Sequence, residues 1–189
     1  ASNTSISIVK SALSLNKSLK SITSAGTSGS NSLYDLSYRI TIKNLSSVTS
    51  KFDYVQDQVT LNTATTGGTF VSPTNGATVT LDTSTSISPT TIASIAGSVL
   101  TLNFNGPMTL TSGQTSNIDY TVRVSYPTAN TSMPINNTAT GYIGTDTITA
   151  SAGVNAVSVN IKTTYTLQID FATSGYVTVD ASQVNGSSC

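Results

Sequence analysis

The sequence contains no histidine, no tryptophan and no glutamate, and its single cysteine, Cys189, is the last residue. Without histidine, neither a Ser-His-Asp triad nor a Cys-His pair can be assembled. Zinc sites built from clustered cysteine and histidine ligands are excluded for the same reason. We therefore expect no catalytic residues, no resident metal and no cofactor. For Cys189, pairing with another molecule, a free thiol and an inert chain end all stay open.

Charged residues make up only 8% of the 189 residues, against about 25% in an ordinary soluble domain. Eight basic and eight acidic residues cancel, so the chain lacks the basic surface that nucleic-acid-binding proteins carry. No apolar run approaches the roughly 20 residues that a membrane-spanning helix requires. The first residues do not have the basic and apolar regions of a signal peptide, so we expect that any export signal has been removed or was never part of the chain.

In place of charge, the chain has 65 serines and threonines, and its apolar residues alternate with polar ones. In 34–43 the even positions are apolar or aromatic and the odd positions are polar, which puts one face of a strand in a core. The same period of two recurs in 118–126, 157–161 and 165–171. A helix would scatter these apolar residues round its circumference, so the pattern predicts strands.

Turn residues separate further predicted strands at 5–11, 52–61, 77–81, 99–104, 137–143 and 176–179. Many short strands with regular turns favour an all-β, Ig-like or pilin-like β-sandwich, and a short helix over 9–22 is the one helical alternative. The glycines and serines of 23–32 predict a flexible linker. We therefore expect an N-terminal segment over 1–22, a linker over 23–32, and a sandwich over 33–189 that includes a C-terminal hairpin at 164–180.

Two carboxylates in one predicted strand, Asp53 and Asp57, are candidates for acid–base chemistry or for a weak Ca²⁺ site. Four residues apart on one face, they would be separated by about 13 Å, given a rise of about 3.3 Å per residue. That distance is too long for a retaining glycosidase pair. We therefore expect an ordinary solvated strand end at these residues.

A lysine crosslinked to an asparagine or aspartate by an isopeptide bond occurs in some surface β-sandwiches. Such a bond needs the two groups in a buried contact with a catalytic acid. The residues considered for it are Lys43, Lys162, Asp57 and Asp119. All four are assigned to the polar register of a strand or to a strand end, so we do not expect a crosslink.

Six asparagines stand two residues before a serine or threonine and are candidate N-glycosylation sites: Asn3, Asn16, Asn44, Asn130, Asn136 and Asn185. Chance alone predicts about five such motifs in a chain of this composition, so their number proves nothing. A surface with so little charge nevertheless needs a solubilising coat, which hydrated glycans supply. We therefore expect N-linked glycans on a chain located outside the cell.

Five short motifs occur in an order similar to that of a known family: 38–44, 55–59, 110–115, 118–124 and 136–140. Over about 38–140 the chain resembles the conserved Ig-like repeat domain of prokaryotic surface proteins, although the proline that follows the family's Asp motif is missing. With its sequons and low charge, the whole chain also resembles subunits of archaeal thread filaments. This resemblance implies a glycosylated, pilin-like β-sandwich that joins head to tail by donating a strand.

Edge strands with few lysines invite random pairing unless another strand covers them. We therefore expect a secreted pilus-type subunit that forms a head-to-tail homopolymer for adhesion or surface attachment. In it an N-terminal segment adds a strand to the neighbouring subunit. The candidate donor residues are Ser5, Ile6, Ser7, Ile8 and Val9. The C-terminal hairpin is a less favoured donor, and the alternative functions are a self-complete adhesin or cell-surface stalk or S-layer module, and a carbohydrate- or ice-binding module.

Overall fold

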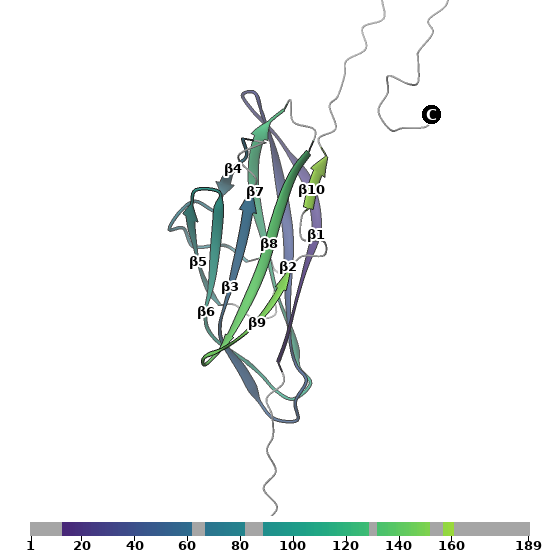
Figure 1. The fold of residues 1–189 in the computed structure, drawn as a ribbon, viewed down its shortest axis with the longest axis vertical. Coiled ribbons are helices and arrows are strands. Elements are labelled where there is room, and N and C mark those ends of the chain that lie inside the picture. Colours follow the sequence, from purple (N-terminus) through teal and green to yellow (C-terminus); the bar gives the residue numbers. More distant parts are fainter. Residues whose placement is uncertain (1–12, 62–66, 82–88, 129–131, 152–156, 161–189) are drawn as a thin grey trace, which may run out of the picture.

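The computed structural model describes residues 13–61, 67–81, 89–128, 132–151 and 157–160. Within these ranges ten strands form two antiparallel sheets that pack face to face, and no helix occurs (Figure 1). The prediction of an all-β sandwich is therefore confirmed.

The first sheet contains four strands in the order β1, β2, β7 and β4. Their bounds are Leu13–Ser28 for β1, Asn31–Asn44 for β2, Thr115–Pro127 for β7 and Thr69–Ser72 for β4. The second sheet has the order β10, β8, β3, β6 and β5, and β9 also bonds to β8. These strands are β3 (Ser50–Leu61), β5 (Thr90–Ala96), β6 (Val99–Leu110), β8 (Ser132–Ile143), β9 (Asp146–Ser151) and β10 (Val157–Asn160).

Tight turns join consecutive strands into hairpins. β1 and β2 are joined at Gly29, whose φ of 59° lies in the left-handed region that glycine adopts without steric cost. β5 and β6 are joined in the same way at Gly97, also with a φ of 59°. These glycines let the chain reverse within two residues. β5 and β6 then pair without a register shift, whereas the register of β1 and β2 shifts between Ser24 and Thr27 and again between Leu19 and Ser21.

The core lies between the sheets and is built from the alternating residues that the sequence predicts. In the first sheet the fully buried residues are Leu36, Tyr38, Ile40, Ile42, Ile118, Tyr120, Val122, Val124 and Tyr126. In the second sheet they include Phe52, Val55, Val59, Leu100, Leu102, Phe104, Leu110, Ile135 and Ala139. Each large side chain in these rows contributes about 1.5–3 kcal/mol by leaving water, so the two rows hold the sheets together.

A bulge interrupts the alternation of β3 near its start. Phe52 pairs with Met108, but Tyr54 pairs with Asn105, so β6 advances three residues where β3 advances two and the extra residue lies on β6. Phe52 faces the core from an even position, whereas Val55 and the inward residues after it stand at odd positions. The bulge therefore decides which face of β3 carries each polar residue.

The predicted linker over 23–32 is wrong. Residues up to Ser28 continue β1, and the next two residues turn the chain into β2. Backbone hydrogen bonds to β2 hold this stretch as a strand, although none of its side chains from 21 to 28 is buried. The helical alternative for 9–22 also fails over its described part, because residues from Leu13 belong to the first sheet.

Other expectations differ in detail. Of the predicted strand at 77–81, only two isolated bridges form, from Thr78 to Ile92 and from Leu81 to Tyr120. Strands β4, β5 and β9 are absent from the strands predicted from the sequence. The candidate donor segment 5–9, the C-terminal hairpin at 164–180 and Cys189 lie outside the described residues.

The described part of the chain enters and leaves the sandwich at opposite ends of its long axis (Figure 1). β1 starts opposite the last residue of β2 and runs toward the Gly29 turn. β10 pairs with the first residues of β8 and ends beside the start of that strand. The start of β1 and the end of β10 therefore lie toward opposite ends of the sandwich (Figure 1).

Candidate functional site

Three polar side chains stand in rows of the sandwich that are otherwise apolar. Lys17 lies on β1 and is 3% exposed, Asp57 lies on β3 and is fully buried, and Asn137 lies on β8 and is 3% exposed. The hydroxyl group of Tyr120 on β7 joins them from the first sheet. We call Lys17, Asp57, Tyr120 and Asn137 the buried polar cluster.

The cluster is held together by direct contacts. Lys17 Nζ lies 2.6 Å from Asp57 Oδ1 and donates a hydrogen bond to the Tyr120 hydroxyl at 2.5 Å. The Tyr120 hydroxyl donates to Asp57 Oδ2, and Asn137 Nδ2 donates to the Tyr120 hydroxyl at 3.3 Å. Within the described residues, Asn137 Oδ1 has no hydrogen-bond partner. The amine, the carboxyl and the carboxamide therefore surround one hydroxyl group.

Two aromatic rings close the cluster off from water. The Lys17 nitrogen is 4.9 Å from the ring centre of Tyr38 and 5.0 Å from that of Tyr120. The two rings stack with their centres 5.7 Å apart, and Phe104 packs on Tyr120 from another side. Aromatic faces attract a cation but do not solvate it as water does, so the charged form of Lys17 is poorly stabilised.

Burial shifts the protonation of both members of the ion pair toward the neutral form. Burial lowers the pKa of Lys17, and the nearby charge of Asp57 opposes this only in part. Burial likewise raises the pKa of Asp57, against the opposing effects of Lys17, Tyr120 and Asn137. Burial also raises the pKa of Tyr120 well above its usual value, so the hydroxyl keeps its proton. A buried pair of this kind is costly to maintain as two full charges.

The expectation that Asp53 and Asp57 share a solvated face is wrong. Because the alternation of β3 changes at its bulged pairing with β6, Asp57 faces the core, whereas Asp53 accepts a hydrogen bond of 2.7 Å from the backbone N–H of Gly144. Asp53 also lies 3.3 Å from Lys51 Nζ. The two carboxylates therefore do not act on one ligand, and the described residues contain no group of three or more side chains suited to a metal ion.

Asp57 was wrongly assigned to the polar register, and Lys17 was not considered as its partner. The sequence carries a signal for both, because Lys17 alternates with Leu15 and Leu19, and Asp57 with Val55 and Val59. Asn137 interrupts its row in the same way, between Ile135 and Ala139. Of the other residues considered for a crosslink, Lys43 is exposed and Lys162 is outside the described residues. Asp119 is on the outer face of the first sheet, where its buried carboxylate contacts Arg39 and Lys20.

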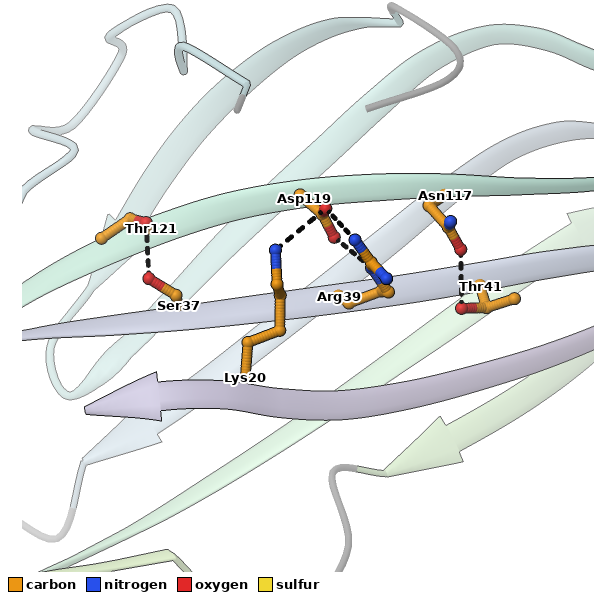
Figure 2. Close-up of polar contacts among 7 residues, drawn as sticks. All are labelled: Lys20, Ser37, Arg39, Thr41, Asn117, Asp119 and Thr121. Atoms are coloured by element: carbon orange, nitrogen blue, oxygen red, sulfur yellow. Dashed lines mark hydrogen bonds and ion pairs between the residues drawn. The ribbon is translucent and has the colours of Figure 1, made fainter. Parts of the chain in front are cut away.

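The outer face of the first sheet is a row of paired polar groups (Figure 2). Arg39 on β2 binds both carboxylate oxygens of Asp119 on β7, at 2.7 and 2.6 Å, and Lys20 on β1 adds a contact of 3.2 Å. The Ser37–Thr121 and Thr41–Asn117 pairs lie on either side. These side chains bind one another across the strands, as cross-strand pairs do in a stable sheet.

The six candidate glycosylation sites differ in their surroundings. Asn16 on β1 and Asn136 on β8 are exposed, so a sugar can be attached there. Asn44 is fully buried, and its Nδ2 donates to the carbonyl oxygens of Val48 and Leu110 at 2.7 and 3.0 Å. A glycan on that nitrogen would remove both hydrogen bonds, so we drop Asn44 from the candidates. Asn3, Asn130 and Asn185 lie outside the described residues.

The outer edge of β1 is unpaired in the part of the chain that the structure describes, because β1 ends the order of its sheet. At the other edge of this sheet, β4 bonds to β7 only from Arg123 to Ser125. The contacts of β1 with β8 and β9 bring the two sheets together along one side of the sandwich. An edge of 16 residues such as that of β1 is a place where another strand can bind.

Comparison with known proteins does not assign a family. No family model matches the chain, and no curated protein matches it. Among solved structures, the chain is similar to a GH20 exo-β-N-acetylglucosaminidase from Vibrio harveyi bound to N-acetylglucosamine, with 11% identity and a TM-score of 0.34. An inactive D437A mutant of that enzyme matches with 11% identity and a TM-score of 0.30. In both cases 85% of this chain is covered, but only 20% of the enzyme.

Among the residues described, no helix is long and apolar enough to cross a membrane.

Proposed function

We propose that the chain is a structural, non-catalytic subunit of an extracellular filament whose subunits join head to tail by strand donation. The observation that carries this proposal is the open edge of β1 over residues 21–28, near the end of the sandwich where β10 stops. An Ig-like, pilin-like sandwich on the cell surface, as in archaeal thread filaments, has the architecture that this assembly needs.

The edge at 21–28 is incomplete in two respects. It bonds to β2 on one side and to no described strand on the other, and none of its side chains is buried. A strand from a neighbouring copy would continue the sheet through backbone hydrogen bonds, which depend little on sequence. It would also cover Ile22, which is only partly buried.

The proposed donor is the segment 5–9, in which Ile6 and Ile8 alternate with serines. In an added strand these two isoleucines point to one face and the serines to the other. Ile6 and Ile8 would then contact the apolar side of the edge, while the serines face water. The donor segment precedes β1 in the chain, and β1 itself starts at the opposite end of the sandwich from the acceptor edge (Figure 1).

A donor segment and an acceptor edge at opposite ends of each subunit favour an open polymer. A contact between two different surfaces of identical subunits is heterologous, and it produces a filament when the repeated rotation does not close into a ring. Glycans at the exposed Asn16 and Asn136 would lie on the outside of strands and supply the hydration that the low charge does not.

The experiment compares two double variants of the full chain by negative-stain electron microscopy. Ile6→Asp with Ile8→Asp should abolish filaments, because each charge would enter an apolar contact. Ser5→Asp with Ser7→Asp adds the same charge on the solvent face and should leave filaments intact. Deletion of residues 1–12 should leave a soluble, weakened monomer, and filaments that persist after this deletion contradict the proposal.

One observation favours a second candidate, a self-complete adhesin, stalk or S-layer module. β1 pairs with β2 of its own chain over most of its length, and Lys17 reaches the core of its own sandwich. Any exchanged strand is therefore confined to residues outside 13–28. Size-exclusion chromatography at several concentrations distinguishes the two, because a monomer at every concentration favours the module.

A further inference from the structure

We propose that the buried polar cluster is a self-crosslinking site, in which Lys17 Nζ forms an isopeptide bond with Cγ of Asn137 and Asp57 carries the protons. This inference does not depend on the proposed polymer, because all the groups belong to one chain. A filament subunit and a self-complete module would both form the bond.

The first argument is the placement of the three groups. The Lys17 amine is 2.6 Å from the Asp57 carboxyl, and the Tyr120 hydroxyl is within hydrogen-bond distance of both Lys17 and Asn137. All four residues are at least nine-tenths buried, and they come from four different strands. The two groups that would react are thus held close together where water does not compete as a nucleophile.

The second argument is the protonation state that the site favours. Transfer of one proton from Lys17 to Asp57 converts the ion pair into a neutral amine and a carboxylic acid without changing the net charge. Burial favours this neutral form by lowering the pKa of Lys17 and raising that of Asp57. A lysine nitrogen is a nucleophile only after it has lost its proton, so the cluster prepares the amine for attack.

The reaction balances without a metal, an oxidant or another reagent. The neutral nitrogen attacks Cγ of Asn137, and the Asp57 acid protonates the carboxamide oxygen. The Asp57 carboxylate then takes a proton from the lysine nitrogen and delivers it to Asn137 Nδ2. The bond from Cγ to Nδ2 breaks, ammonia leaves, and the proton on the oxygen returns to Asp57. One N–C bond has formed, one has broken, and Asp57 has recovered its proton.

Asn137 is favoured over Asp57 as the crosslinked partner. Its Oδ1, the atom that gains negative charge during the attack, has no hydrogen-bond partner among the described residues and is free to accept one from the Asp57 acid. Both oxygens of Asp57 already contact Lys17 or Tyr120. A carboxyl held between an amine and a carboxamide is placed to move protons between them.

The bond would join the two sheets at the side where their edges meet. Lys17 lies on β1, the edge strand of the first sheet, and Asn137 lies on β8, near the edge of the second. The crosslink would prevent β1 from leaving the sandwich, although no side chain in its second half, residues 21–28, is buried. A subunit that carries tension along its long axis gains resistance to unfolding from such a bond.

The deciding measurement is the mass of the denatured chain after expression in a host without N-glycosylation. The crosslinked chain is lighter than the sequence mass by one ammonia molecule. After digestion with trypsin, the peptide 11–20, uncut at Lys17, should be joined to the peptide 124–162 that contains Asn137. An unchanged mass, or a link from 11–20 to the peptide 52–123 that contains Asp57, overturns the proposal.

Two isosteric variants test the roles of the residues. Lys17→Met removes the nucleophile, and Asp57→Asn keeps the shape but removes the proton carrier, so both should have the full sequence mass. Lys20→Met on the same strand is the matched control and should keep the loss of ammonia. A crosslink that still forms in Asp57→Asn contradicts the role of Asp57. Far-UV circular dichroism checks that each variant is folded, and the wild-type mass decides the question even if a variant is not.

Discussion

Replacing Gly141 with alanine tests the packing that brings Asp57 and Asn137 into one layer of the core. Gly141 follows Ile135, Asn137 and Ala139 in the inward row of β8, and it pairs with Val55 on β3. A Cβ atom built on Gly141 would lie 2.4 Å from Cε1 and 2.6 Å from Cδ1 of Phe52. Two carbon atoms in contact are normally about 3.5–4.0 Å apart, so the added methyl group overlaps the ring by about 1 Å.

Phe52 has no room to move away, because its side chain is fully buried. An extra methyl group in a filled core typically costs about 1–3 kcal/mol. Replacing a strand glycine returns about 0.5–1 kcal/mol, because the unfolded chain loses less entropy on folding. Because a 2.4 Å approach puts the overlap at the upper end of that cost, the net destabilisation should be about 2–2.5 kcal/mol, which lowers the melting temperature of a domain of this size by roughly 4–10 °C.

Urea unfolding followed by circular dichroism measures this loss as a lower midpoint with an unchanged slope. The matched control is Thr140→Ala on the neighbouring outward position, which should cost less than about 1 kcal/mol. Adding Phe52→Leu to Gly141→Ala should recover part of the loss, as a coupling between two residues in contact. Mass spectrometry must show the same covalent state in all the variants. A Gly141→Ala chain as stable as the wild type would refute the register that pairs Gly141 with Val55 and Asp57 with Ala139, and so puts Asn137 diagonal to Asp57.

The contacts of Asp57, Asp119 and Asn44 predict the stability of three further variants. Lys17→Met leaves Asp57 buried without its cation, and burial raises the pKa of Asp57. Since the folded pKa then exceeds the unfolded one, unfolding titrations should show greatest stability below about pH 4 and a loss of about 1.4 kcal/mol per pH unit above it, until the folded pKa is passed. Asp119→Asn removes a fully buried carboxylate that Arg39 binds through two hydrogen bonds, and should cost about 1.5–3 kcal/mol, with little change at high salt because buried pairs are weakly screened. Asn44→Ala removes the hydrogen bonds that the buried side chain donates to Val48 and Leu110 and the one that it accepts from Ser46, and should lower the free energy of unfolding by about 1–3 kcal/mol in the same assay. Asn136→Ala, at an exposed position, should leave the free energy of unfolding nearly unchanged.

The strands that carry a regular period of two were predicted well from the sequence. The row from Leu36 to Ile42 and the row from Ile118 to Tyr126 are buried as expected, because a strand places every second residue on one face. Segments without that pattern were missed or misassigned. The serine- and glycine-rich end of β1 has the composition of a linker, although hydrogen bonds to β2 hold it as a strand whatever its side chains are.

The buried polar cluster was missed for a different reason. The sequence interpretation assigns Asp57 to the polar register although it stands among valines, and it gives Lys17 no role, whereas the structure buries both because each is the other's partner. The partner was not visible, since Lys17, Asp57 and Asn137 are far apart in the chain. The bulge at the start of β3 added to the error, because it reverses the alternation between Phe52 and Val55.

The sequence by itself determined the all-β class, the absence of histidine-based chemistry and most of the inward-facing residues, because composition and alternation are local properties of the chain. Only the tertiary structure decided which strands are neighbours and which side chains meet between the sheets. A period of two specifies the face on which a residue lies, but not the strand that lies opposite it. The pairing of β3 with β8 and the packing of β1 across from them bring an amine, a carboxyl and a carboxamide together in the core.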